Sequence, residues 1–178
     1  AYCFHSNPSK QNERPFFPAL STEDLISGVD VLARHGCTKL NVAGGEPFLV
    51  RDTTLAITSY AKSRGLFTSV ISNGLLAEAH HSIDMLGVSI DSFDPDTSRR
   101  IGRAPVPLTK LLALRDGSRR FKMNTVVSKH NIHEDFNYAI DILRPDRWKL
   151  FQVLDVPGEN DGHDSCVTSD EFEAFAER

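Results

Sequence analysis

The residues best suited to chemistry stand in two short motifs that follow predicted strands. Gly44-Gly45-Glu46-Pro47 comes directly after a strand predicted at 38–43, and Ser72-Asn73-Gly74 closes a strand predicted at 66–72. Two glycines at the carboxyl end of a strand let the backbone approach a ligand closely, and strand ends are where ligands bind in α/β folds. Small hydroxyl and amide groups there suit ribose hydroxyls or a carboxylate. Taken singly, each motif could also be an ordinary turn.

A second group of candidates is a set of cations with strand spacing. Side chains two apart on a strand share a face. The pairs that share a face are Lys39 with Asn41, Lys122 with Asn124, and Arg147 with Lys149. The residues between and after them, such as Leu40, Met123 and Trp148, are mostly apolar and favour the helix-covered side of a sheet.

The cationic face should therefore look inward, where unpaired charges cost several kcal/mol. Four cations from three strands need an anionic ligand, and a triphosphate is the natural candidate because Lys and Arg suit phosphate oxygens. The alternative is that these side chains lie at strand ends and reach solvent.

The three cysteines give little on their own. Cys3, Cys37 and Cys166 are an odd count without close spacing, which disfavours a disulfide framework. Cys3, in Cys3-Phe4-His5, could be no more than a buried thiol. The histidines have no mutual metal-binding spacing.

The elements that must position these residues alternate along the chain. Strands are predicted at 38–43, 66–72, 83–90, 120–128 and 147–155, and helices at 22–35, 52–64, parts of 94–117, 131–143 and after Thr168. Ser21 can cap the first helix, and Thr168 with Glu171 forms a capping box for the last. Five strands separated by helices predict a parallel α/β sheet with right-handed crossovers, either a partial barrel or an open doubly wound sheet.

Composition limits the classes of function. The 178 residues are enough for one domain with a core, and 40% hydrophobic with 25% charged residues is ordinary for a globular protein. A net charge of −4 speaks against nucleic acid as a partner, and no apolar run predicts a membrane contact. The expected location is the cytoplasm.

Together the motifs resemble the radical S-adenosylmethionine (SAM) superfamily, and in their order along the chain its viperin-like branch. The matching segments are CFH, KLNVAGGEPFL, ISNGLL, SIDSFD, IGR, FKMNTVVSKHNIHED and PDRWKLFQVLDVPGEN. The resemblance implies a partial (β/α)6-type radical SAM barrel, incomplete at the N-terminus, over residues 1–155, and the start of a C-terminal extension at 156–178. On this reading the chain is part of a longer protein and begins inside a cysteine motif, so alone it is expected to be inactive.

The resemblance also implies the roles of the candidate residues. Cys3 matches the last ligand of a CxxxCxxC loop that binds a 4Fe-4S cluster. The residues expected to bind SAM are Phe4, Gly44, Gly45, Glu46, Pro47, Ser72, Asn73 and Arg103, although Arg103 could equally contact substrate phosphates or be a surface residue. The residues expected to bind a nucleoside triphosphate are Lys39, Asn41, Lys122, Asn124, Arg147 and Lys149.

The implied reaction is conversion of CTP, or UTP, to its 3′-deoxy-3′,4′-didehydro analogue through a 5′-deoxyadenosyl radical. It requires an electron donor, and the family implies a role in antiviral defence. Two alternatives stay open: a radical SAM enzyme with another substrate, and a non-catalytic nucleotide-binding α/β domain. Ala43 before the GGEP motif and the short segment after Arg103 depart from the family and put the choice of base in doubt.

Overall fold

Five parallel strands form one sheet in the order in which they occur along the chain. The computed structural model describes residues 20–154 and 165–178. The strands are β1 (Lys39–Val42), β2 (Phe67–Ser72), β3 (Met85–Ser89), β4 (Phe121–Val127) and β5 (Arg147–Gln152). Each pairs in parallel with the next, giving the order β1-β2-β3-β4-β5, and β1 and β5 do not pair with each other.

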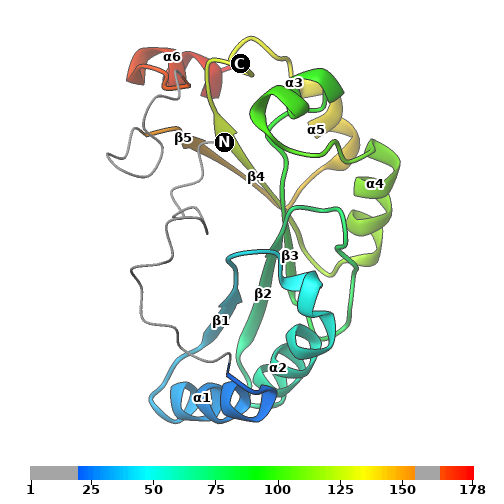
Figure 1. Cartoon of the computed structure of the whole chain (residues 1–178), viewed down its shortest axis with the longest axis vertical. Helices are drawn as coiled ribbons and strands as arrows, with labels where there is room; N and C mark the ends of the chain where they lie inside the picture. The colour runs from blue at the N-terminus through cyan, green and yellow to red at the C-terminus, as the bar shows by residue number, and fades with distance from the viewer. Residues whose placement is uncertain (1–19, 155–164) are drawn as a thin grey trace, which may run out of the picture.

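This order decides between the two predicted architectures. A doubly wound sheet reverses its strand order once, which places helices on both faces. Here the order never reverses, so right-handed crossovers carry the connecting helices to the same side of the sheet. Figure 1 shows α2, α4 and α5 along one side of the strands. The fold is therefore the partial, open barrel that was predicted.

The helices mostly begin where the sequence predicts. They are α1 (Thr22–Arg34), the 3-10 helix η2 (Pro47–Val50), α2 (Arg51–Ser63), α3 (Pro95–Ile101), α4 (Leu108–Gly117), α5 (Asn137–Leu143) and α6 (Ser169–Ala176). Ser21 accepts a hydrogen bond from the backbone N–H of Asp24, and Thr168 accepts one from that of Glu171. Both form complete capping boxes, which satisfy backbone donors that a helix start leaves unpaired.

The core lies between the sheet and the helices. Strand residues that face the helices are almost fully buried, and α4 and α5 supply the other side of this layer. Among its members are Val70, Leu86, Val88, Phe121, Met123, Val127, Leu111, Leu114 and Leu143. The alternation expected on β4 is confirmed, since Phe121, Met123 and Thr125 are buried while the residues between them are half-buried.

One predicted element is shorter than expected. The helix predicted at 131–143 begins only at Asn137, because residues before it use their side chains to bond the ends of β3 and β4. The Asn131 side chain accepts from the Ser128 N–H at 2.7 Å and donates to the Val126 carbonyl at 2.9 Å. Glu134 accepts from the Ser92 hydroxyl at 2.6 Å and the Phe93 N–H at 2.7 Å. Such side-chain bonds to backbone compete with helix formation.

A pair of glycine substitutions tests the packing of the sheet. Gly74 has a φ of +87°, and a Cβ added there would lie 2.8 Å from Cγ1 of Val88. Gly74→Ala should lower the free energy of unfolding by about 2 kcal/mol, through backbone strain and overpacking. Gly28 lies inside α1, with nothing within 4 Å of an added Cβ. Gly28→Ala should raise the same quantity by about 0.5–1 kcal/mol. Urea unfolding followed by circular dichroism measures both, and equal effects would contradict this account.

Candidate active site

The two predicted glycine-containing motifs meet at the carboxyl ends of β1 and β2, where Glu46 joins them. Oε1 of Glu46 accepts from the Ser72 hydroxyl at 2.8 Å, and Oε2 accepts from the Asn73 N–H at 2.7 Å. Oε1 also accepts from the Phe48 N–H at 3.2 Å, so the same carboxylate caps η2. One side chain thus fixes both loops relative to each other.

The backbone at these loops leaves room for a ligand. Gly44 and Gly45 have φ values of +98° and +55°, a region that favours glycine, and a Cβ at either would meet no atom of the described residues within 4 Å. Pro47 stands at the start of η2 and is buried. In the second loop the Gly74 N–H donates to the Ser72 hydroxyl and the Leu75 N–H to Oδ1 of Asn73. The described residues therefore leave space for a ligand at the turn after β1, next to a second loop that hydrogen bonds hold in place.

Arg103 lies beside Asn73 at a small pocket of about 140 Å³. Its Nε forms an ion pair with Oδ2 of Asp91, whose side chain is only 1% exposed. Oδ1 of Asp91 accepts from the Val126 N–H at 2.7 Å, which holds the carboxylate in place. Because Asp91 is fixed, it fixes the guanidinium against the pocket.

Asp91 is a residue that the sequence reasoning missed. It belongs to the SIDSFD segment, two positions beyond the end of β3. An acidic residue directly after an apolar strand was the available signal, because parallel strands bring their carboxyl ends to one edge. Its partner on β4 could not be read from the sequence.

The six predicted substrate residues share the face of the sheet opposite the helices. Lys122 pairs in register with Arg147, and Asn124 with Lys149, while Lys39 and Asn41 stand on β1. Lys122, Asn124 and Lys149 are half-buried, whereas Lys39, Asn41 and Arg147 are exposed. Each of the two expected outcomes therefore holds for some of these residues: both β1 residues and Arg147 reach solvent, whereas the β4 pair and Lys149 are partly enclosed.

The cations on this face affect one another. Burial, followed by the positive charges of Lys149, Arg147 and Lys39, lowers the pKa of Lys122. Within the described residues, none of the four takes part in an ion pair. Like charges that repel without a compensating carboxylate are what an anionic ligand would neutralise.

Asn124 adds an unused acceptor to the same face. Its Oδ1 is buried and has no hydrogen-bond partner within the described part of the chain. Buried polar atoms are nearly always paired, so an orphaned one calls for a partner from outside the fold. The face as a whole can hold a molecule that combines negative charge with a hydrogen-bond donor.

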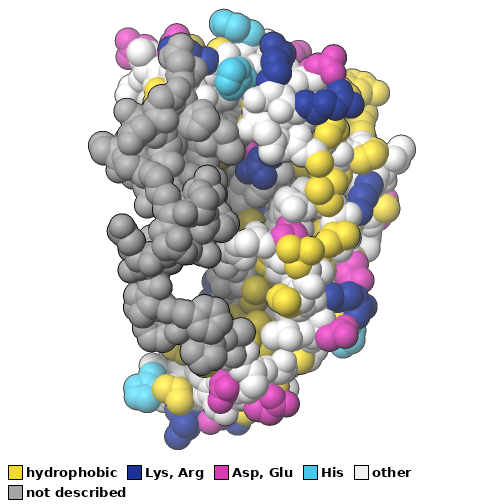
Figure 2. Space-filling view, in the orientation of Figure 1, with side chains coloured by type: hydrophobic (Ala, Val, Ile, Leu, Met, Phe, Trp, Pro, Cys, Tyr) yellow, Lys and Arg dark blue, Asp and Glu magenta, His cyan; other side chains and the backbone are white. Residues whose placement is uncertain are grey.

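Cys3 and Phe4 lie outside the described residues. Over residues 20–154 and 165–178, no group of three His, Cys, Asp or Glu side chains could hold a metal ion. The same ranges contain no helix that is both long and apolar enough to cross a bilayer. On the face seen in Figure 2, basic and acidic side chains are interspersed over the described surface.

Comparison with protein families matches residues 1–143 to the radical SAM superfamily. Among curated proteins, the S-adenosylmethionine-dependent nucleotide dehydratase RSAD2 of Oncorhynchus mykiss is 33% identical over 99% of this chain and 56% of its own length. The S-adenosylmethionine-dependent nucleotide dehydratase of Flammeovirga pacifica is 31% identical over 89% of this chain and 60% of its own length. The chain thus spans little more than half of these relatives.

Among solved structures, Streptococcus suis SuiB bound to S-adenosylmethionine aligns with a TM-score of 0.75 at 15% identity, covering 99% of this chain and 42% of SuiB. The coproporphyrinogen III oxidase HemN of Escherichia coli, described as a radical SAM enzyme, aligns with a TM-score of 0.63 at 13% identity, covering 87% of this chain and 43% of HemN. At such identities the likeness concerns the fold alone, and it agrees with the open parallel barrel.

The Glu46 contacts can be tested by comparison with a nearby surface acid. Glu46→Ala leaves the Ser72 hydroxyl and the Asn73 N–H without their acceptor and should lower the free energy of unfolding by about 2 kcal/mol. Glu78 forms a partly exposed ion pair with Arg51 at 2.7 Å. Glu78→Ala should therefore cost less than about 1 kcal/mol. Chemical denaturation measures both, and a Glu46→Ala effect no larger than the control would refute the role of Glu46.

The repulsion among the cations predicts a variant that is more stable than the wild type. Lys122→Met removes a half-buried charge and should raise the free energy of unfolding by about 1 kcal/mol without ligand. Lys39→Met, at an exposed position, should change it by less than about 0.5 kcal/mol.

The pH dependence of this difference has a definite sign. Because the pKa of Lys122 is lowered in the folded state, the unfolded chain binds more protons between that pKa and the ordinary value of 10.5. Wild-type stability should therefore gain on that of Lys122→Met as the pH rises through this window. A constant difference across the window would contradict the assignment.

Proposed function

The chain belongs to the radical SAM superfamily, and we propose that it is a viperin-like nucleotide dehydratase whose sheet binds a nucleoside triphosphate for dehydration. The observation that carries this proposal is the group of four cations without ion-pair partners among the described residues, on the face opposite the helices. A triphosphate supplies the missing negative charge, because its oxygens suit Lys and Arg donors.

The remaining part of the nucleotide has a proposed partner as well. Asn124 stands two residues beyond Lys122, on the same face and nearer the carboxyl end of β4. Its Oδ1 needs a hydrogen-bond donor. A sugar hydroxyl next to the phosphates supplies that donor. We assign phosphate binding to Lys39, Lys122, Arg147 and Lys149, with Asn41 and Asn124 as polar contacts. CTP or UTP is the proposed substrate, and the didehydro product and antiviral role are proposed from the family.

The loops at the strand ends suit the amino-acid end of SAM. The open space above Gly44 and Gly45 admits close approach of an amino group to backbone carbonyls, and the pocket between Asn73 and Arg103 offers donors for a carboxylate. Glu46, Pro47 and Ser72 hold these loops in place. The residues present therefore fit the group.

The chemistry comes from outside the described residues. A 4Fe-4S cluster, which Cys3 would help to hold, and SAM at the strand ends would together supply radical chemistry directed at the nucleotide ribose. Cys3 is the proposed cluster ligand in this chain, with Phe4 beside it, and an external one-electron donor is required. The described residues bind and orient the two molecules, with the nucleotide on the sheet face and SAM at the strand ends.

The proposal predicts which nucleotides and which variants change binding. In calorimetric titration of the full-length protein, CTP or UTP should bind at least about tenfold more tightly than the monophosphate, because the cations contact phosphate oxygens. Lys149→Ala should weaken triphosphate binding by about tenfold, whereas Arg34→Ala, which removes an exposed cation on α1, should leave it unchanged.

The reaction itself needs a separate measurement. After anaerobic reconstitution with iron, sulfide, a reductant and SAM, the full-length protein should form 5′-deoxyadenosine in a nucleotide-dependent manner. The assay is run with each of several nucleoside triphosphates and with a control without nucleotide. If none of them raises 5′-deoxyadenosine formation above the control, the dehydratase assignment is wrong. A peptide panel run in parallel tests the alternative of a radical SAM enzyme with another substrate.

A further inference from the structure

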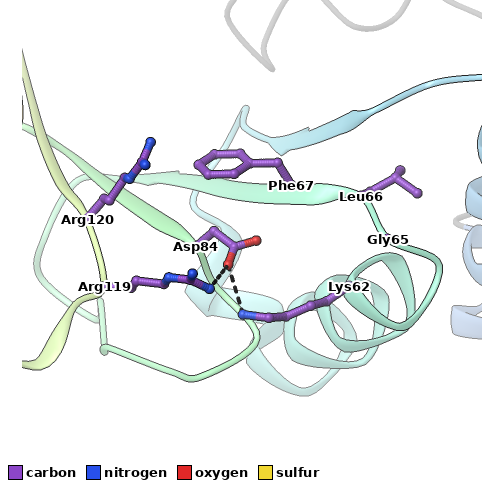
Figure 3. Close-up of a pocket in the computed structure, with 7 residues that line it drawn as sticks. All are labelled: Lys62, Gly65, Leu66, Phe67, Asp84, Arg119 and Arg120. Carbon is purple, nitrogen blue, oxygen red and sulfur yellow. Dashed lines mark hydrogen bonds and ion pairs between the residues drawn. The ribbon is translucent and has the colours of Figure 1, made fainter.

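A second basic pocket opens at the opposite end of the sheet from the glycine loops. It has a volume of about 340 Å³ and is lined by Lys62, Gly65, Leu66, Phe67, Asp84, Arg119 and Arg120. Figure 3 shows Lys62 and Arg119 converging on Asp84 from two sides, with Arg120 and Phe67 above. These residues precede or begin β2, β3 and β4, so the pocket lies at the amino ends of the strands. We call it the basal pocket.

The single acid of the basal pocket has no capacity left for a further cation. Oδ1 of Asp84 accepts from Lys62 at 2.9 Å and from Arg119 at 3.2 Å. Oδ2 accepts from the Thr68 N–H at 3.0 Å and lies 3.1 Å from the oxygen of the Thr68 hydroxyl. Burial alone would raise the pKa of Asp84, but the hydrogen bonds from Lys62 and Thr68 outweigh it and the pKa is lowered. Asp84 therefore stays ionised at neutral pH, and the lining of the pocket holds three cations, two of which contact this carboxylate.

The cations keep donors that the fold does not use. Arg119 makes one hydrogen bond to the described residues, through Nη1, and its side chain is 72% exposed. Arg120 has no carboxylate partner among the described residues and lies 5.7 Å from the centre of the Phe67 ring. Lys39, on the neighbouring strand β1, lies 5.4 Å from the same ring centre. Guanidinium groups with unused N–H donors are suited to bidentate contacts with phosphate.

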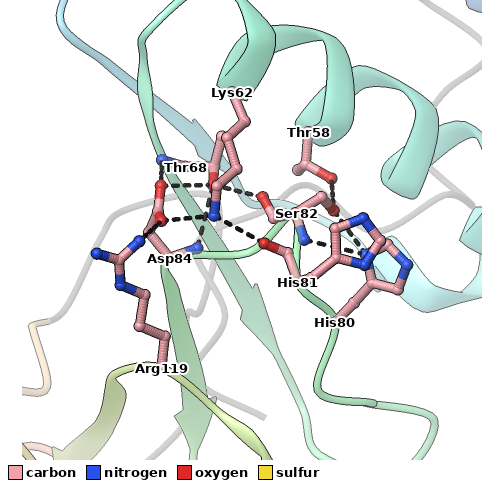
Figure 4. A network of polar contacts seen from close by, with 8 residues as sticks. All are labelled: Thr58, Lys62, Thr68, His80, His81, Ser82, Asp84 and Arg119. Carbon is pink, nitrogen blue, oxygen red and sulfur yellow. Dashed lines mark hydrogen bonds and ion pairs between the residues drawn. The ribbon is translucent and has the colours of Figure 1, made fainter.

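The network beneath the pocket holds the cations in place before any ligand binds. Lys62 donates to the His81 carbonyl at 2.7 Å as well as to Asp84. Ser82 continues the network, since the Thr68 hydroxyl donates to its carbonyl and its own hydroxyl contacts Thr58 at 2.8 Å (Figure 4). The Asp84 side chain is 9% exposed, so Lys62 and Arg119 bond a nearly buried carboxylate and not a mobile surface one. Preorganised donors lower the entropy cost of binding.

We propose that the basal pocket is an anion site for a small phosphate-bearing group, distinct from the cationic sheet face. Its volume is at the lower end of ligand sites, which suits a diphosphate and not a whole nucleotide. The phosphate can belong to free pyrophosphate or to the tail of a nucleotide. The pocket lining includes none of the proposed substrate residues, so the assignment does not depend on the proposed function, although the two sites adjoin at Phe67, whose ring Lys39 also approaches.

The test is calorimetric titration of the intact protein with sodium pyrophosphate at low ionic strength. The proposed sheet face and the basal pocket should give two binding events. Combined Arg119→Ala and Arg120→Ala substitution should weaken one event by at least about tenfold and leave the other. Lys149→Ala should do the opposite, so failure of the sheet-face assignment is distinguishable. If the double variant titrates like the wild type, the basal site does not exist.

A variant expected to bind pyrophosphate more tightly shows that weaker binding by the double variant is not merely the result of misfolding. Asp84→Asn keeps an acceptor for Thr68 but removes the charge that Lys62 and Arg119 share. It should bind pyrophosphate severalfold more tightly, and unchanged or weaker binding by a folded variant, checked by circular dichroism, would overturn the proposal. Titration with CTP separates the two sources: an effect of the double variant on pyrophosphate alone indicates a free anion, and an effect on both indicates a nucleotide tail. No effect on either overturns the site.

Discussion

The two-residue period of a β-strand gives the sheet two faces of opposite chemistry, and most of the molecule follows from that constraint. On β4, Phe121, Met123 and Thr125 turn to the helices while Lys122 and Asn124 turn away from them. Because the strand order never reverses, the helices that connect the described strands gather on the apolar side of the sheet, opposite the cationic side. The same alternation that builds the core therefore also builds the binding face.

The repulsion among the cations of this face lowers the stability of the ligand-free protein, and the proposed ligand would relieve it. Lys122 is half-buried, its pKa is lowered, and no described carboxylate neutralises the four charges. In contrast, the acids near the ends of the strands are fully engaged. Glu46 joins two loops at the carboxyl ends, Asp91 holds Arg103 there, and Asp84 ties three strands at the amino ends. Charge is satisfied where the fold needs rigidity and left unsatisfied where the proposed substrate binds.

The two ends of the sheet also differ in what they can hold. At the carboxyl ends, positive φ values and missing side chains at Gly44 and Gly45 bring backbone close to a ligand. At the amino ends, arginine side chains around Asp84 provide only charge and hydrogen-bond donors. The first arrangement suits the polar amino-acid end of a cofactor, and the second suits a small anion.

Local pattern was sufficient to predict the five strands, the Ser21 cap, the Thr168–Glu171 capping box, the alternation on β4 and the place of GGEP and SNG at strand ends, because these depend on residues close in the chain. The roles of the site residues stay predictions, and Cys3 and Phe4 lie outside the described residues. Tertiary structure alone decided that Glu46 bonds Ser72 and Asn73, and that Asp91 pairs with Arg103. It also moved the start of the helix predicted from 131 to Asn137 and assembled the basal pocket. Apart from the short-range Asn131 contacts, the partners are more than ten residues apart in sequence, and the register of neighbouring strands brings them within hydrogen-bond distance.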